Sequence, residues 1–452
     1  MKFEFFGLID ILATLGWFLV FAAFAYIIRI RHSKDPDYKL YLPNFYVHIL
    51  LGMFFGLIYT VYYEDGGDTV YYWVTASRLN DVFWDNPVNY LSEILSNPEP
   101  GKMPNFYDKT GSPPHWIYYE NESFFVAKVA SIFSFFSLKS YFALNLMFSV
   151  ISGWVSWRFF RFIKRTVQLD FKFAAIACLF LPTVGFWCSG VIKDTVAYCA
   201  TIGLVIGFFY IISGERKKRF LHLILILFCS YILLNSRAFM LVASYVPLMV
   251  IFVFKLNQHK PFLIKLLTRI TGIALTAALI LFYLNRSNEF GEFSSTKVME
   301  TAEVIHNDFK QNETYTGKRY DLGLDDFNTA SLIRVMPLAI LTTLYRPFLW
   351  EVDGVLMLLN GLESTVLLFF TLQMIFSKKE KRINLSHFNH SFYLYALIFI
   401  LVLGFFVGIT SILFGILARL KAPILPFFVL LIFSYKQAQR EKENSKPKKI
   451  EY

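Results

Sequence analysis

The chain has 452 residues, of which 56% are hydrophobic and 19% aromatic, and only 17% are charged. Soluble domains usually carry about 25% charged residues, so this composition argues against a soluble globular protein. Apolar runs of about 20 residues recur along the chain, and each approaches the length that crosses a bilayer as a helix. Basic cytoplasmic loops explain the formal net charge of +11 better than a nucleic-acid partner does, so we expect no nucleic acid.

The first apolar run, residues 7–28, has no basic region before it and no small-residue cleavage site after it. It therefore indicates a retained membrane helix rather than a signal peptide. We place the basic clusters that follow alternate apolar runs in the cytoplasm, which puts the N-terminus outside and the C-terminus inside. The expected spans are residues 7–28, 43–63, 140–160, 173–187, 190–212, 221–235, 238–254, 262–284, 354–376, 392–409 and 423–435.

The sequence thus predicts an all-α polytopic membrane protein with about eleven transmembrane helices, within a range of about ten to thirteen, and a single membrane domain over residues 1–452. Residues 64–137 and 285–352 form two long outer segments, and residues 436–452 form a basic cytoplasmic tail. Each outer segment contains an apolar stretch, at 123–138 and 332–344, that is too short to span comfortably. We expect both stretches to lie on the membrane or dip into it.

A Lys-Asp pair lies at the join between the fourth and fifth expected spans, and such charges near lipid are functional by default. The fifth, seventh and eleventh spans begin on the outer face, where their N-termini and nearby cations favour a phosphate. We expect Ser189, Asn235 and Ser236 to act as N-caps, and Asp194 to orient or balance Lys193. The alternative is that these basic residues only contact lipid headgroups. The predicted phosphate-binding residues are Lys193, Arg237, Lys421 and Arg334.

Asp68 is the best single acid, because it follows a Gly-Gly pair soon after an outgoing helix. It can act as a general base on a sugar hydroxyl. With Glu64 and Asp65 it can instead hold a divalent cation, Mg or Mn, through oxygen ligands. The third alternative is a solvated acidic turn. Arg346 and Glu351 either pair with each other, or Arg346 contacts phosphate.

Four motifs carry a resemblance to a known class. They are Gly66-Gly67-Asp68-Thr69 followed by Tyr71, Phe186-Trp187-Cys188-Ser189-Gly190 leading to Lys193-Asp194, Leu344-Tyr345-Arg346-Pro347-Phe348-Leu349-Trp350-Glu351, and Arg419-Leu420-Lys421-Ala422-Pro423-Ile424-Leu425-Pro426-Phe427. These motifs resemble bacterial polytopic proteins of polysaccharide gene clusters. The layout is also similar to exopolysaccharide and O-antigen polymerases and to GT-C glycosyltransferases.

The resemblance implies sugar transfer at the periplasmic face of the bacterial inner membrane, from an undecaprenyl-type lipid phosphate or pyrophosphate. Asp68 matches the acidic base of GT-C enzymes, although their acid usually follows the first helix and Asp68 follows the second. Polymerases of the O-antigen kind rely on outer-face arginines, for which Arg237, Arg346 and Arg419 are candidates. We thus expect a catalytic set of Asp68, Arg346 and Arg419, supported by Asp194, Glu351 and Ser189.

The expected partners are a lipid-linked sugar and membrane lipid. One alternative is a flippase or transporter for a lipid-linked saccharide. Few mid-helix breaks, and no obvious charge deep inside the spans, weigh against it. Another alternative is a non-catalytic scaffold of an envelope complex.

Overall fold

The computed structural model describes residues 5–63, 66–99, 101–213, 218–256, 303–304, 306–310, 317–324, 327–352, 354–376 and 390–444. Regular structure in these ranges is helical, apart from one isolated β-bridge between Arg319 and Leu413. The predicted all-α class is therefore confirmed for the described residues. The chain divides into two compact units, Met1–Leu241 and Val242–Tyr452, which are described separately.

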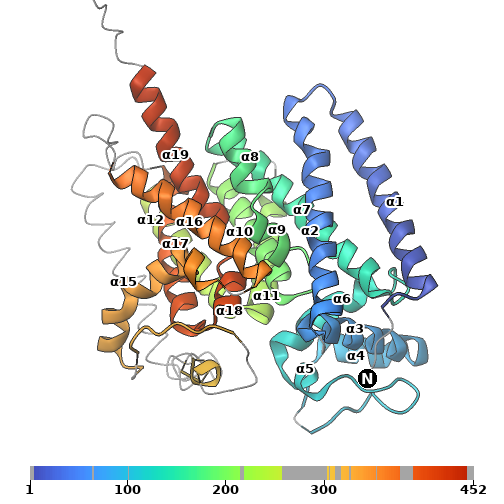
Figure 1. Ribbon diagram of the computed structural model, residues 1–452. Helices are drawn as coiled ribbons and strands as arrows, with labels where there is room; N and C mark the ends of the chain where they lie inside the picture. The colour runs from blue at the N-terminus through green and yellow to red at the C-terminus, as the bar shows by residue number, and fades with distance from the viewer. Residues whose placement is uncertain are drawn as a thin grey trace, which may run out of the picture. The chain divides into compact units, whose positions relative to one another are not determined.

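The first unit begins with two long antiparallel helices and continues into a layer of shorter ones (Figure 1). Its elements are α1 (Leu8–Arg31), η1 (Pro36–Leu40), α2 (Tyr41–Leu57), the π-helical turn η2 (Ile58–Tyr62), α3 (Gly67–Asp85), α4 (Pro87–Leu95), α5 (His115–Tyr119), α6 (Asn121–Ser134), α7 (Tyr141–Thr166), α8 (Phe171–Leu179), α9 (Pro182–Trp187), α10 (Lys193–Ser213) and α11 (Arg219–Ser236). α12 (Ala238–Leu256) begins at the end of the first unit and continues into the second.

The second unit begins within α12, and short helical pieces follow at residues 303–304 and 306–310. Its further elements are α15 (Thr329–Tyr345), η5 (Leu349–Glu351), α16 (Val355–Ile375), α17 (Ser391–Thr410), α18 (Phe414–Leu420) and α19 (Leu425–Asn444). α17 packs against α15 and α19, and α16 packs against α19. The expected basic tail from residue 436 is helical as far as Asn444, because α19 continues through it.

Seven helices among the described residues are long and apolar enough to cross a membrane. They are Leu8–Arg31, Pro36–Tyr62, Lys193–Ser213, Arg219–Ser236, Ala238–Lys255, Met357–Ile375 and Ser391–Thr410. Phe414–Leu420 and Leu425–Lys442 pass the same test as a pair, with a bend of 68° between them. The eighth expected span, residues 262–284, lies outside the described residues. The predicted number of about eleven is not reached in the part of the chain that the structure describes.

Two expected spans differ from the prediction for a physical reason. The third is α7, which is long enough at 26 residues but carries polar side chains along its buried length. The fourth is divided into α8 and α9, because Pro182 starts a new helix after the irregular residues Phe180 and Leu181. Both short stretches in the outer segments form helices below the spanning length, as expected: α6 has 14 residues and α15 has 17.

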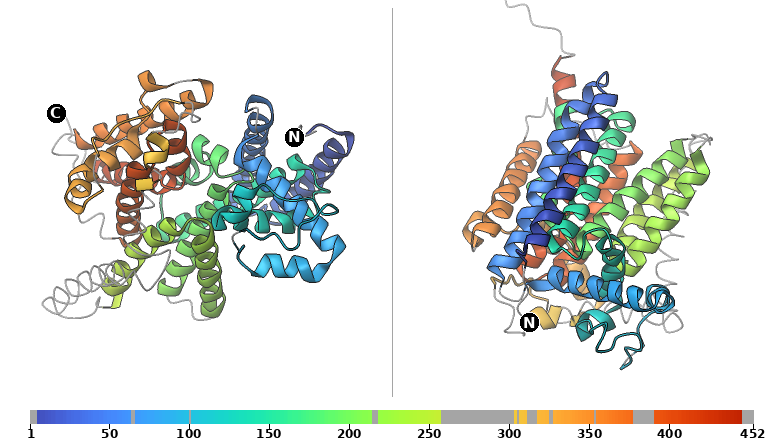
Figure 2. Two further views of the ribbon diagram at one scale, coloured as in Figure 1. Left: turned by 90° about the horizontal axis from the view of Figure 1, so that it is seen from below. Right: turned by 90° about the vertical axis from the view of Figure 1, so that its right-hand side faces the viewer.

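The core of the first unit lies where α7 packs against α1, α2, α8 and α10. The outer segment 64–137 becomes α3 to α6, with α3 packed against α4 and α6. In Figures 1 and 2, α3 and α4 run across the direction of α1 and α2, at the end of α2. This layer positions the charged residues described next.

Candidate functional site

The residues between α9 and α10 leave helical geometry while remaining buried. Val191 N donates to Asn145 Oδ1 at 3.0 Å, and Ser149 Oγ donates to the carbonyl of Ser189 at 2.8 Å. Buried irregular backbone is tolerated where the protein satisfies its polar groups, and α7 does this here. The break therefore fixes where α10 begins, at Lys193.

Small residues let α2 approach both α7 and this break. A Cβ atom on Gly52 would lie 2.0 Å from Ser149 Oγ and 2.9 Å from the carbonyl oxygen of Ser189. The Asn145 amide also donates to the carbonyl of Gly52. Small residues at helix interfaces permit such close backbone approach in membranes. Gly52 thus sets the spacing that lets Asn145 and Ser149 hold the break.

The predicted N-caps are wrong. α10 begins four residues after Ser189, whose hydroxyl lies 2.9 Å from His48 Nδ1 instead. Asn235 and Ser236 belong to α11 and donate to the carbonyls of Tyr231 and Ile232, at 2.8 and 2.7 Å. Short polar side chains bond readily to a carbonyl one turn back, and this bond replaces the expected cap.

Lys193 meets two acids from the start of α6. Its ammonium group forms an ion pair with Glu120 and lies 3.7 Å from a carboxylate oxygen of Glu122. The Lys193 side chain is 8% exposed, whereas those of Glu120 and Glu122 are 49% and 39% exposed. Ser123 Oγ also donates to Glu120 at 2.6 Å. The cation is therefore buried behind two partly exposed carboxylates.

Asp194, which we expected to orient or balance Lys193, forms an ion pair with Arg237. Arg237 Nη2 lies 3.1 Å from Asp194 Oδ1, and the Asp194 side chain is 1% exposed. Consecutive helix residues point about 100° apart, so Lys193 and Asp194 reach different neighbours. We call Glu120, Glu122, Lys193, Asp194 and Arg237 the rim cluster.

The rim cluster combines two cations with three carboxylates, so its formal charge is +2 − 3 = −1. A site prepared for phosphate alone would be net positive. Lys193 becomes a stronger partner for another anion when Glu120 moves aside or becomes protonated. The sequence interpretation missed Glu120 and Glu122, although two acids directly before an apolar run are a signal of a helix N-terminus.

Asp68 lies half-buried in the first turn of α3. Gly66 and Gly67 have φ values of 70° and 55°, and a Cβ atom on Gly67 would lie 2.7 Å from the Tyr59 ring. The glycine pair therefore serves a left-handed turn and the packing of Tyr59. Glu64 and Asp65 lie outside the described residues. Within the described ranges, which leave out these two members of the suggested cation site, no group of three or more His, Cys, Asp and Glu side chains could hold a metal ion.

Two aromatic rings connect the Asp68 turn with the rim cluster. Tyr59, packed on Gly67, lies 4.6 Å from Phe55 between ring centroids. Phe55 in turn fills the space beside Gly190, where a Cβ atom would lie 2.2 Å from its ring. Gly190 is three residues before Lys193, so the turn and the cluster lie at the same end of α2.

In the second unit, Arg346 and Glu351 pair with each other, one of the two predicted alternatives. Arg346 Nε lies 3.0 and 3.1 Å from the two carboxylate oxygens of Glu351, and its guanidinium lies 5.3 and 5.0 Å from the rings of Tyr320 and Phe414. Burial raises the pKa of Glu351, but the hydrogen bonds from Arg346 and Phe348 N outweigh it and hold the pKa below its usual value. Such bidentate, ring-stacked geometry suits arginine specifically.

Lys421 is buried at the bend between α18 and α19. Its ammonium group donates to the carbonyl of Arg346 at 2.8 Å and to Ser364 Oγ at 2.7 Å. These bonds are internal, so the predicted phosphate contact of Lys421 finds no support. Arg419 is half-buried in the last turn of α18, and Arg334 is exposed on α15. The expected single set of basic residues is thus divided between the two units.

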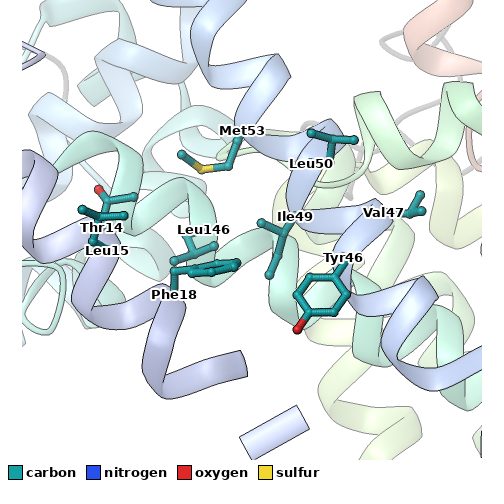
Figure 3. Close-up of a pocket in the computed structure, with 9 residues that line it drawn as sticks. All are labelled: Thr14, Leu15, Phe18, Tyr46, Val47, Ile49, Leu50, Met53 and Leu146. Atoms are coloured by element: carbon teal, nitrogen blue, oxygen red, sulfur yellow. The ribbon is translucent and has the colours of Figure 1, made fainter. Parts of the chain in front are cut away.

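An apolar groove of about 500 Å³ lies between α1 and α2, with Leu146 of α7 at its floor (Figure 3). Phe18 and Tyr46 face each other across it at 6.5 Å between ring centroids. Met53, which also lines it, packs against the buried cluster of Val70, Tyr141 and Phe142. The lining residues are Thr14, Leu15, Phe18, Tyr46, Val47, Ile49, Leu50, Met53 and Leu146.

Comparison of the chain with protein-family profiles, curated proteins and solved structures finds no match.

Proposed function

We propose that the chain is a glycosyltransferase or polysaccharide polymerase of the bacterial inner membrane that uses a lipid-phosphate-linked sugar at the periplasmic face. The observation that carries this proposal is the rim cluster. A buried cation, Lys193, lies behind two half-exposed carboxylates at the end of apolar helices. This arrangement offers a base and a countercharge side by side, as the reaction needs.

In the proposed reaction, an acceptor hydroxyl attacks the anomeric carbon of the donor sugar. The bond between that carbon and the lipid phosphate oxygen breaks, and the phosphate leaves with the bonding electrons. The hydroxyl proton passes to Glu120, which then releases Lys193 to the negative charge growing on the phosphate. Electrostatic stabilisation of this kind usually contributes most to catalysis. Glu122 keeps the local charge balanced while Glu120 is protonated.

Asp194 and Arg237 form the most deeply buried ion pair of the rim cluster. Since Asp194 is almost fully buried against Arg237, it serves better as a positioning residue than as a second base. Asp68 remains a candidate to orient the acceptor, because its turn lies at the same end of α2.

The groove between α1 and α2 fits the lipid part of this substrate. Its lining is apolar, it lies between two candidate spans, and one of its lining residues packs on the core beneath α3. Its volume falls within the usual range of ligand sites, about 300–1,000 Å³. A hydrocarbon chain held there would extend toward the Asp68 turn, because Met53 packs against the buried cluster that contains Val70.

The test compares polymer made by cells that carry Lys193→Met, Glu120→Gln, Asp68→Asn, Arg346→Ala and Arg419→Ala with polymer from the unchanged chain. Lys102→Met is the matched control, since Lys102 is exposed and pairs with Glu99 in a loop. We expect Lys193→Met and Glu120→Gln to lose polymer while the protein remains folded in the membrane. Normal polymer in both variants would refute the assignment of the site.

A second candidate function, a flippase for a lipid-linked saccharide, gains one observation. Residues 188–192 are buried non-helical backbone at the expected join between the fourth and fifth spans, and α18 and α19 meet at a bend of 68°. Broken helices are typical of transporter binding sites. Reconstituted vesicles separate the functions: a flippase moves intact lipid-linked sugar, whereas a transferase changes the chain length of the product.

If the chain is instead a non-catalytic scaffold of an envelope complex, removing the charges of the rim cluster should leave its function intact.

A further inference from the structure

α4 has an apolar face that no described part of the protein covers. Val88, Leu91 and Leu95 are exposed, and their spacing of three and four residues places them on one side of the helix. The opposite side is buried: Tyr90 contacts Ser131, and Glu93 accepts hydrogen bonds from the Tyr118 hydroxyl and the Asn105 amide. α4 is therefore amphipathic with its polar anchors inward.

The apolar face extends beyond α4. Trp84, in the last turn of α3, is 75% exposed, and Phe136 and Leu138 after α6 are exposed as well. Only Asn86 separates α3 from α4, so Trp84 lies next to the start of α4, and its ring packs against that of Phe135 beside Phe136. We call Trp84, Val88, Leu91, Leu95, Phe136 and Leu138 the interface patch.

The interface patch adjoins the exposed apolar surface of α1 at Phe136. Trp17 of α1 donates from Nε1 to the carbonyl of Phe136 at 2.7 Å. α1 is long and apolar enough to cross a membrane, and its neighbouring side chains Leu15 and Leu19 are exposed. A bilayer that covers α1 therefore reaches the patch beside Trp17, in the first half of the helix.

We propose that the interface patch lies in the boundary between headgroups and acyl chains, with α4 parallel to the bilayer plane. The orientation of α4 across α1 and α2 fits this placement (Figures 1 and 2). Amphipathic helices bind this boundary through their apolar side, and Trp is enriched there. A covering protein partner would not need the patch to join the lipid-facing surface of a span. The proposal does not depend on the chemistry of the rim cluster.

The inference has a structural consequence for the rim cluster. α4 and α6 are linked through the hydrogen bond between Tyr90 and Ser131 and by the packing of α3 on both. Glu120 and Glu122 lie at the start of α6. Anchoring the patch in the lipid boundary would therefore hold these two carboxylates at the level of lipid headgroups.

The test places a spin label at residue 88, 91 or 95 in the full chain, reconstituted in phosphatidylcholine vesicles after replacement of its four cysteines. Oxygen partitions into the bilayer, whereas a charged-chelate nickel reagent stays in water. We expect labels at these positions to have high oxygen access and several-fold lower nickel access than a label at Lys102, an exposed loop residue.

Nickel access equal to that at residue 102 would overturn the proposal, because the patch would then face water. A label immobilised and inaccessible to both reagents would overturn it too, because protein would then cover the patch. A second measurement needs no label: brominated lipids should quench the unchanged chain more than Trp84→Phe. Equal quenching of the two would also contradict the placement, since Trp84 would then lie outside the bilayer.

Discussion

Asn145 and Val191 are 46 positions apart, yet the Val191 N–H donates to Asn145 Oδ1 at 3.0 Å inside the first unit. Both residues are fully buried. The same Asn145 side chain donates from Nδ2 to the carbonyl of Gly52. One amide thus ties α2 and α7 to the break that precedes Lys193.

Replacing Asn145 with Leu should destabilise the protein strongly. Val191 N–H and the Gly52 carbonyl would lose their partner away from water, and each stranded group costs about 1–3 kcal/mol. Thermal unfolding in detergent measures the loss. Asn235→Leu is the matched control, because the Asn235 amide bonds within its own helix near the surface and should shift the midpoint far less. Equal unfolding midpoints for the two variants would contradict the role of Asn145 in joining α2 and α7 to the break.

Gly52→Ala should lower the unfolding midpoint, while Gly16→Ala should not. The added methyl at Gly52 would meet Ser149 Oγ and the Ser189 carbonyl below contact distance, whereas nothing lies within 4 Å of one at Gly16. Alanine is favoured over glycine inside a helix by about 0.5–1 kcal/mol, so Gly16→Ala should be neutral or stabilising. Paired melting curves decide the matter. A stable Gly52→Ala would show that α2 and α7 can separate freely.

Two substitutions of rim-cluster cations should differ in their effect on stability. Arg237→Met leaves the carboxylate of Asp194 buried, and breaking a buried ion pair typically costs about 3–5 kcal/mol. Lys193→Met leaves Glu120 and Glu122, which can be hydrated because both are partly exposed. Unfolding of both variants in detergent should therefore show a large loss for Arg237→Met and a small one for Lys193→Met. The reverse order would contradict the burial of Asp194.

Lys128 should make stability rise with pH above about 8. Burial lowers its pKa to about 8, although the nearby Glu93 carboxylate acts in the opposite direction. Between that pKa and the usual 10.5, the unfolded chain binds more protons than the folded one, so stability increases with pH; below about 8 the charged form is present in both states and the penalty is constant. The check is the difference in unfolding midpoint between the unchanged chain and Lys128→Met from pH 7 to 9.5. A difference independent of pH would contradict the lowered pKa of Lys128.

The expected spans could be predicted closely where hydropathy is a local property. The runs at residues 7–28, 190–212 and 392–409 became α1, α10 and α17 with ends shifted by a few residues. The run at 173–187 was misread as one span, since hydropathy does not register the division before Pro182. α7 was correctly located, but its buried polar side chains Asn145 and Ser149 find their hydrogen-bond partners in α2 and in the break, which the sequence does not show.

The candidate site was predictable in part. A Lys-Asp pair at the start of α10 was evident from the chain itself, and so was Arg237 at a neighbouring helix end. The partners were not, because Glu120 is 73 positions from Lys193, and Arg237 is 43 from Asp194. The predicted N-cap at Ser189 was wrong, because its hydroxyl is hydrogen-bonded to His48, which is 141 positions away in the chain.

The sequence by itself determined that this chain folds into long apolar helices with charged residues at their ends, because side-chain transfer to lipid is a local energy that each segment carries alone. Tertiary structure alone decided which charges meet, which glycines approach a neighbour and where irregular backbone is tolerated. Those outcomes depend on distances between segments far apart in the chain. Lys193 shows both: its place at a helix start follows from its neighbours in sequence, and its role depends on the two acids that packing brings to it.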